Sequence, residues 1–172
     1  TPRSRNDLRL GMTTEVRGTA ITLDGAGASV ATASSIVFSS ELQGTVDSVD
    51  ATANRLVVLG QGVDVSPATV LDGLSGGLST LTVGDGVEIY GFFDVTTARY
   101  RATRIERKTG VPDFKLRGAV SNLDSVAKAF NIGTQRISYA AVAGDVPATL
   151  ANGDFVRLRL QSAQIGGVWI VS

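Results

Sequence analysis

Hydrophobic and polar residues alternate over short stretches of the chain, with the period of two that is typical of β-strands. Leu42, Gly44 and Val46 fall on one face of such a stretch. The alternation predicts five strands in the middle of the chain, at about residues 42–49, 54–59, 63–65, 87–94 and 99–106. Five short strands in about seventy residues suit a small Greek-key or OB-like barrel, in which closure hides the sheet edges.

Turns and loops separate these strands. Residues 50–54 and 60–62 have the composition of turns, and residues 83–86 form another. Residues 67–80 look like a loop with room for one short helical turn after Ser66, because serine caps helices and proline suits the first helical position. The glycine-rich segment 73–77 lacks the Lys-Ser/Thr of a phosphate-binding loop, which leaves it as a flexible loop.

The chain also repeats itself. The segment 41–50 (ELQGTVDSVD) resembles 115–124 (KLRGAVSNLD) at an offset of 74 residues. A second pattern, Leu-x-x-Gly followed by alternating apolar residues, begins near Leu8, Leu81 and Leu150. These repeats predict tandem five-stranded barrels with little helix: a barrel over 41–108, a linker over 109–114, and a barrel over 115–172 with a divergent C-terminal half.

Residues 1–40 correspond only to the second half of a unit. Either a preceding segment has been removed, or these residues complete a neighbouring barrel with a permuted set of strands. Because an open sheet edge promotes aggregation, we expect this half-unit to pair with something.

Glycines recur inside the predicted strands, at Gly18, Gly44, Gly91 and Gly118. Glycine is unfavourable within a strand unless the sheet coils sharply, bulges or approaches another backbone. The simplest interpretation is that these glycines shape barrel corners.

The amino-acid composition excludes most kinds of catalytic site. The 172 residues include no His and no Cys, which excludes a Ser-His-Asp triad, a cysteine nucleophile and His- or Cys-ligated metals. Acidic residues gather at turns without the spacing of a calcium loop, so we predict no metal site and no cofactor. Carboxylate pairs such as Glu15 with Glu88 belong to different repeats, and we expect a protein that is not an enzyme.

A set of residues between positions 42 and 105 resembles, in identity and spacing, the pattern of a known family. They are Leu42, Gly44, Val46, Val49 and Asp50, then Val83, Gly84, Asp85, Val87, Glu88, Ile89 and Gly91, then Ala102 and Ile105. This pattern is similar to the bacterial domain of unknown function family 5666, which occurs in repeats in exported proteins and lipoproteins. The resemblance implies an OB-like barrel outside the cytoplasmic membrane, periplasmic or extracellular, with lipid anchoring through a segment absent from this chain as one route. It implies no assigned activity.

One strand pair carries candidate binding residues. They are the cations Arg99, Arg101 and Arg104 and the aromatic residues Tyr90 and Phe92. On an OB-like barrel, a basic strand face beside exposed aromatics can bind single-stranded nucleic acid or oligosaccharide. The alternative is a solvated face whose arginines pair with Glu88 or Asp94.

Net charge is zero, with 16 basic and 16 acidic residues, so no global attraction to nucleic acid or anionic membrane exists. No apolar run is long enough to span a bilayer as a helix. We therefore expect a non-catalytic cell-envelope module that binds a protein or polysaccharide through barrel faces and the 67–80 loop. Single-stranded nucleic-acid binding is the alternative, and the oligomeric state stays open.

Overall fold

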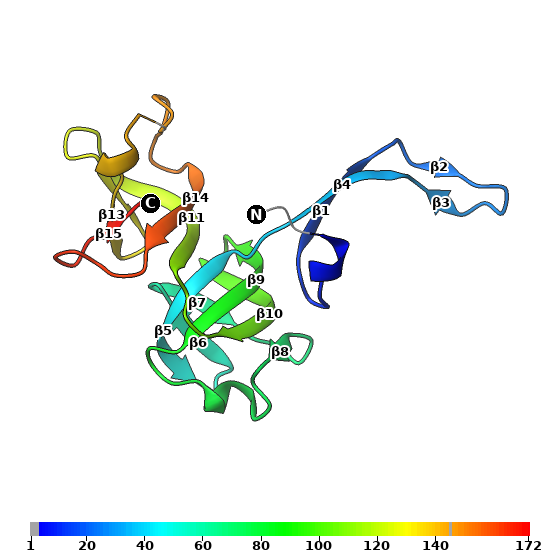
Figure 1. Cartoon of the computed structure of the whole chain (residues 1–172), viewed down its shortest axis with the longest axis horizontal. Helices are drawn as coiled ribbons and strands as arrows, with labels where there is room; N and C mark the ends of the chain where they lie inside the picture. The colour runs from blue at the N-terminus through cyan, green and yellow to red at the C-terminus, as the bar shows by residue number, and fades with distance from the viewer. Residues whose placement is uncertain (1–3, 145) are drawn as a thin grey trace.

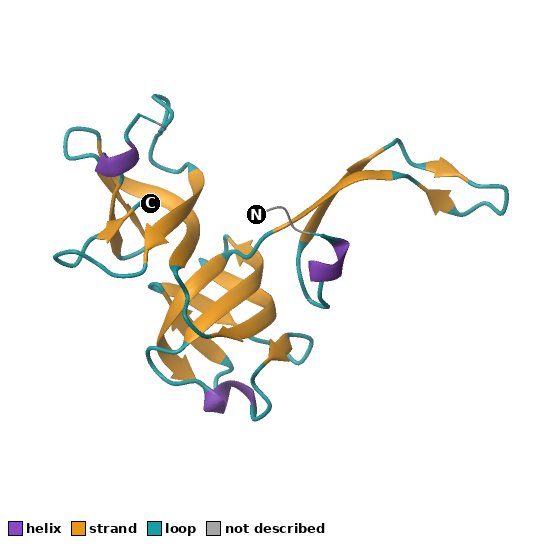
Figure 2. Cartoon of the chain, in the orientation of Figure 1, coloured by secondary structure: helices purple, strands orange, loops and turns teal. Residues whose placement is uncertain are grey.

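The computed structural model of the chain describes residues 4–144 and 146–172 (Figure 1). Its strands are β1 (Thr14–Gly18), β2 (Thr22–Leu23), β3 (Ser29–Val30), β4 (Ala33–Phe38), β5 (Leu42–Asp50), β6 (Arg55–Val58), β7 (Gln61–Asp64), β8 (Val70–Asp72), β9 (Gly86–Asp94), β10 (Arg99–Lys108), β11 (Asp113–Asp124), β12 (Ala129–Ile132), β13 (Gln135–Ser138), β14 (Phe155–Gln161) and β15 (Trp169–Ile170). Three short 3-10 helices join them: η1 (Arg5–Asp7), η2 (Gly77–Thr80) and η3 (Ala140–Val142). Figure 2 shows strands and loops throughout, and the predicted all-β class is confirmed.

The central strands close into a barrel. β5 pairs antiparallel with β6, β6 with β7, and β10 with β9, while β7 and β10 run parallel. Antiparallel pairing of β9 with β5 completes the circle. The order β5-β6-β7-β10-β9 is that of an OB-like barrel, as the sequence predicts.

The barrel interior is filled from alternate positions of its strands. Leu42, Val63, Val87, Ile89 and Ile105 have no exposed surface. Gly44 lies opposite the Leu59 side chain, and a Cβ at this position would come within 2.8 Å of it. The glycine therefore makes room for a core leucine, which supports the interpretation of strand glycines as shaping residues.

A second sheet follows the same pairing order. β11 pairs antiparallel with β12 and β14, β12 with β13, and β13 runs parallel to β15. Closure between β14 and the end of β15 consists of one isolated bridge, Leu160 to Val171. The β15 strand has only two residues, so this sheet is closed more weakly than the first.

Several backbone contacts recur at the repeat offset. The Val46 amide donates to the Asp85 carbonyl, and the Val120 amide donates to the Asp154 carbonyl. Asn54 and Lys128, 74 residues apart, both have a positive φ of 53°. These correspondences favour a common ancestor for the two sheets, while the tandem repeat of a whole barrel stays a prediction.

The β1–β4 hairpin extends away from both sheets (Figure 1). Every residue of β1 is exposed, and the short strands β2 and β3 form its far end. We call residues 14–38 the arm. Among the described residues the arm strands pair only with each other, so the arm does not complete either barrel by a permuted pairing.

The 67–80 segment differs from its prediction. Its helical turn is η2, ten residues beyond the expected start after Ser66, and the strand β8 lies between them. The Ser66 hydroxyl accepts from the Ala68 amide and the Thr69 hydroxyl donates to the Ala102 carbonyl. These bonds make a turn there and tie the loop to β10, which overrides the helix-start signal.

The two sheets meet along β11, which pairs antiparallel with β5 where Lys115 lies opposite Gln43. The Gln43 amide group donates to the Asp113 carbonyl at 3.0 Å, and the Tyr100 hydroxyl donates to the Arg117 carbonyl at 2.6 Å. The rings of Phe93 and Phe155, one from each sheet, have centroids 5.2 Å apart. Hydrogen bonds and ring contacts thus join the two sheets directly.

Candidate functional site

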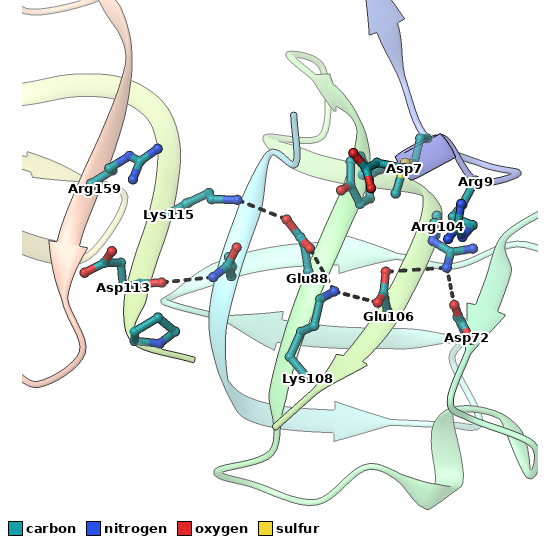
Figure 3. Close-up of a pocket in the computed structure, with 14 residues that line it drawn as sticks. Asp7, Arg9, Asp72, Glu88, Arg104, Glu106, Lys108, Asp113, Lys115 and Arg159 are labelled. Atoms are coloured by element: carbon teal, nitrogen blue, oxygen red, sulfur yellow. Dashed lines mark hydrogen bonds and ion pairs between the residues drawn. The ribbon is translucent and has the colours of Figure 1, made fainter. Parts of the chain in front are cut away.

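A polar cleft of about 570 Å³ lies over the outer face of β9 and β10. The N-terminal segment borders one side and the start of β11 borders the other. Its lining consists of Asp7, Arg9, Met12, Gln43, Asp72, Glu88, Tyr90, Arg104, Glu106, Lys108, Pro112, Asp113, Lys115 and Arg159. Figure 3 shows these side chains converging from the N-terminal segment, the first barrel and the second sheet.

A continuous chain of ion pairs crosses the floor of this cleft (Figure 3). Glu88 accepts from Lys115 at 3.0 Å and pairs with Lys108 at 3.3 Å. Lys108 also pairs with Glu106 at 2.5 Å. Arg104 then pairs with Glu106 at 3.4 Å and with Asp72, which the 67–80 loop supplies.

Glu88 is the most enclosed carboxylate of this chain of ion pairs, with 6 % of its side chain exposed. Burial by itself would raise the pKa of Glu88. Hydrogen bonds from the Ser40 hydroxyl, at 2.7 Å, and from Lys115, together with the charges of Lys115 and Lys108, outweigh burial and hold the pKa below its usual range. Glu88 is therefore a carboxylate at neutral pH.

The pKa of Lys108 is shifted in the opposite direction, upward. Burial would lower the pKa of its ammonium group, but the hydrogen bond to Glu106 and the charge of Glu88 outweigh burial and raise the pKa. The lysine stays charged across the physiological range. Both partners of this pair are thus held in their ionised forms.

The cleft as a whole is balanced in charge. Five acidic residues (Asp7, Asp72, Glu88, Glu106 and Asp113) face five basic ones (Arg9, Arg104, Lys108, Lys115 and Arg159). A surface of this kind presents many hydrogen-bond donors and acceptors without a strong field of one sign.

The five predicted site residues differ in burial and in their partners. Tyr90 and Arg104 line the cleft but are buried, with 1 % and 4 % exposure. The N-terminal segment covers this region: Arg104 donates to the Leu10 carbonyl at 3.2 Å. Arg99 is held by Asp64 at 2.8 Å, rather than by the expected Glu88 or Asp94.

Phe92 and Arg101 are the two predicted residues that remain open to a ligand. They are cross-strand neighbours on β9 and β10, and Phe92 is 64 % exposed. Together with Asp64 and Ser66 they line a second hollow of about 400 Å³. The five residues therefore share one outer face by register, but burial of Tyr90 and Arg104 and the pairing of Arg99 prevent them from forming one exposed basic, aromatic surface.

A second ion cluster joins the two sheets, and the sequence prediction did not include it. Glu41 has 6 % of its side chain exposed and pairs with Arg117 at 2.6 Å and with Arg157 at 3.3 Å. Arg157 thus has a partner in the first barrel, in addition to its place on β14. The signal available in the sequence is the exchange of sign at equivalent repeat positions, Glu41 against Lys115.

No helix among the described residues is long and apolar enough to cross a membrane. In the same residues no group of three or more acidic, His or Cys side chains is arranged to hold a metal ion.

Comparison with known proteins identifies one domain. No curated protein and no solved structure matches the chain. Residues 43–106, which form most of the first barrel, match the family described as Domain of unknown function (DUF5666). This match covers Gly44, Gly91 and the Gly84-Asp85 turn, which are among the residues that carried the resemblance in the sequence. The closed five-stranded barrel at the centre of this chain therefore belongs to the DUF5666 domain family.

Proposed function

We propose that this protein is a non-catalytic binding module whose cleft over β9 and β10 takes a neutral, hydroxyl-rich ligand such as a polysaccharide segment. The balanced charge of the cleft carries the proposal. Paired carboxylates and cations accept and donate hydrogen bonds to hydroxyl groups without requiring a charged ligand. The volume of about 570 Å³ lies within the range of small-ligand sites.

The carboxylates in the cleft support a binding role over a catalytic one. A general acid for glycoside hydrolysis needs a raised pKa, and a glycosidase places two such carboxyl groups on either side of the scissile bond. The pKa of Glu88 is lowered, and both Glu88 and Glu106 are engaged by Lys108. Side chains held in this way can position a ligand but are poorly suited to transfer a proton.

The cellular location belongs to the same proposal. The family resemblance favours a place in the bacterial cell envelope, outside the cytoplasmic membrane, where polysaccharides are abundant.

Isothermal titration with neutral and with anionic envelope polysaccharides tests the proposal. We expect binding of a neutral polymer that changes little between low and physiological salt, and that weakens in Arg159→Ala, whose exposed side chain borders the cleft. Arg55→Ala is the matched control, since Arg55 is exposed on β6 and lies outside the cleft. Equal loss in both variants, or binding of anionic polymers alone, would contradict the proposal.

Nucleic-acid binding is the second candidate, favoured by the exposed Phe92 beside Arg101. A phosphate-binding protein loses affinity steeply as salt rises, whereas sugar recognition does not. Arg99 is already paired with Asp64. We therefore expect that the fluorescence anisotropy of labelled single-stranded DNA or RNA shows no binding whose affinity falls steeply as salt rises. Steep binding that disappears in an Arg99→Ser/Arg101→Ser variant would instead establish this surface as a nucleic-acid site.

A further inference from the structure

Within the described residues, the arm strands β1 and β4 form a two-stranded sheet of their own. β1 and β4 pair antiparallel, and both outer edges of this ribbon face solvent. An isolated two-stranded ribbon is marginally stable, and its free edges are available to other strands. Its internal geometry indicates which strands those are.

The arm has the register of the last two strands of the first barrel. In the arm, Thr14 pairs with Phe38 and Val16 with Ile36, and Gly18 pairs with Ala33 after a bulge that skips one residue. In the barrel, the corresponding pairs are Val87 with Arg107, Ile89 with Ile105, and Gly91 with Ala102, again across a one-residue bulge. Both ribbons therefore share the pairing and the position of the bulge.

The bulge glycines have the same surroundings in the two ribbons. A Cβ at Gly18 would collide with the Thr32 carbonyl and approach Ala33 Cα at 3.1 Å. A Cβ at Gly91 would collide with the Arg101 carbonyl and approach Ala102 Cα at the same distance. A bulge with glycine at this position bends a ribbon as a barrel requires. The arm is thus already curved like a barrel wall.

The two faces of the arm differ as the two faces of a barrel wall do. Val16 and Ile36 occupy the positions of Ile89 and Ile105, which fill the barrel core without exposure. In the arm they are 59 % and 45 % exposed. The opposite face carries a salt bridge between Arg17 and Glu15 at 2.7 Å. The apolar face therefore lacks the core that it matches.

We propose that the arm is the fourth and fifth strands of an OB-like barrel, and that a second polypeptide supplies the first three strands as an antiparallel meander of the β5–β7 type. Within the described residues, β5–β7 is closed by β9 and β10, and β11–β13 is joined to β14 and β15. Neither meander of this chain is open to its own arm, so the occupant comes from outside these residues.

The barrel pairings give the expected contacts of this partner. Leu42 on β5 lies opposite Ile89, so an apolar residue of the partner's first strand would lie opposite Val16. β7 runs parallel to β10, with Val63 beside Tyr100, so the partner's third strand would run parallel to the arm near Ala31, just before β4. Burial of the apolar face and pairing of both edges would drive the association.

The test uses the full chain and a labelled peptide of residues 41–66, which is the chain's own three-stranded segment. We expect saturable binding by fluorescence anisotropy and slower amide hydrogen exchange in β1 and β4. The substitutions Val16→Lys and Ile36→Lys together should weaken binding at least about tenfold, because two charges would enter the apolar face. Ser35→Lys, on the opposite face of the arm where Ser35 pairs with Arg17, should leave binding unchanged.

The controls separate arm pairing from other effects. A scrambled peptide should not bind, and unfolding midpoints of the arm variants should match that of the unmodified protein, since the arm contributes no strand to either sheet. Absence of binding to the unmodified chain would overturn the proposal. Equal binding to the Val16→Lys/Ile36→Lys variant would also overturn it, because the peptide would then enter the first barrel by strand exchange.

Discussion

Glu88 and Glu15 occupy equivalent positions in the repeat pattern, 73 residues apart, in very different surroundings. Glu88 has 6 % of its side chain exposed and contacts Ser40, Lys108 and Lys115. Glu15 has 61 % exposed and pairs only with Arg17 among the described residues. An exposed pair contributes little, whereas removing one member of a buried pair leaves the other charge without compensation.

We therefore expect Glu88→Gln to destabilise the protein by about 3 kcal/mol at pH 7, because it leaves the ammonium groups of Lys115 and Lys108 without their carboxylate. Glu15→Gln should change stability by less than about 0.5 kcal/mol. Urea unfolding at pH 7 measures both free energies. Similar values for the two variants would show that the cleft ion pairs contribute no more than an exposed pair.

The Glu88 contribution should also depend on pH. Its folded pKa lies below the ordinary value of 4.5, so its stabilisation is present above that value and is lost as pH falls through the folded pKa. The difference in unfolding free energy between the unmodified protein and Glu88→Gln should shrink steadily below about pH 4.5. A difference that stays constant to pH 3 would contradict the assigned cause.

At the scale of elements, the strand glycines provide a matched pair of tests. Gly91 and Gly18 have the same bulge geometry, but only Gly91 lies in a closed barrel. Gly91→Ala should lower the free energy of unfolding by about 1–3 kcal/mol, because the Arg101 backbone must shift within a packed wall. Gly18→Ala should leave the unfolding midpoint unchanged, since the arm can fray without loss of the barrel or of the second sheet. Equal losses would mean that the arm is part of the cooperative unit.

The five barrel strands were predictable because their alternation is regular and glycines mark their bends. Alternation could not reveal β8, which has three residues and forms only because Val70–Asp72 aligns with β10. The Ser66-Pro67 signal failed because tertiary hydrogen bonds to β10 determine that turn.

The candidate site was predictable only in part, because the exposure of a strand depends on the elements that cover it. Tyr90, Arg101 and Arg104 lie on the outer face of the β9–β10 pair. Whether such a face meets solvent depends on segments far along the chain, here the Leu10 and Gly11 carbonyls bound to Arg104 and Thr103. The periodicity of residues within one strand does not indicate whether a distant segment, such as the one around Leu10, covers that strand.

At the scale of the whole molecule, the contacts between the two sheets determine how the chain unfolds. Glu41 pairs with Arg117 and Arg157, and the Phe155 ring lies between Phe93 and the Arg117 guanidinium, which is 5.0 Å from its centroid. These contacts join side chains of the two sheets without belonging to either core. Interfaces with buried charge pairs and aromatic contacts couple the stabilities of the units they join.

We accordingly expect a single calorimetric transition for the unmodified protein, with equal calorimetric and van't Hoff enthalpies. Glu41→Gln combined with Phe155→Ala should raise the ratio of the calorimetric to the van't Hoff enthalpy above one, because it removes the ion cluster and the ring contact but leaves both interiors intact. The Lys115–Glu88 ion pair, the Tyr100–Arg117 hydrogen bond and the pairing of β5 with β11 remain, so the two sheets stay partly coupled. The weakly bridged second sheet should unfold first. Phe92→Ala is the control, since Phe92 is exposed away from this junction. A ratio above one in the unmodified protein, or a ratio of one in the double variant, would contradict the assigned role of these contacts.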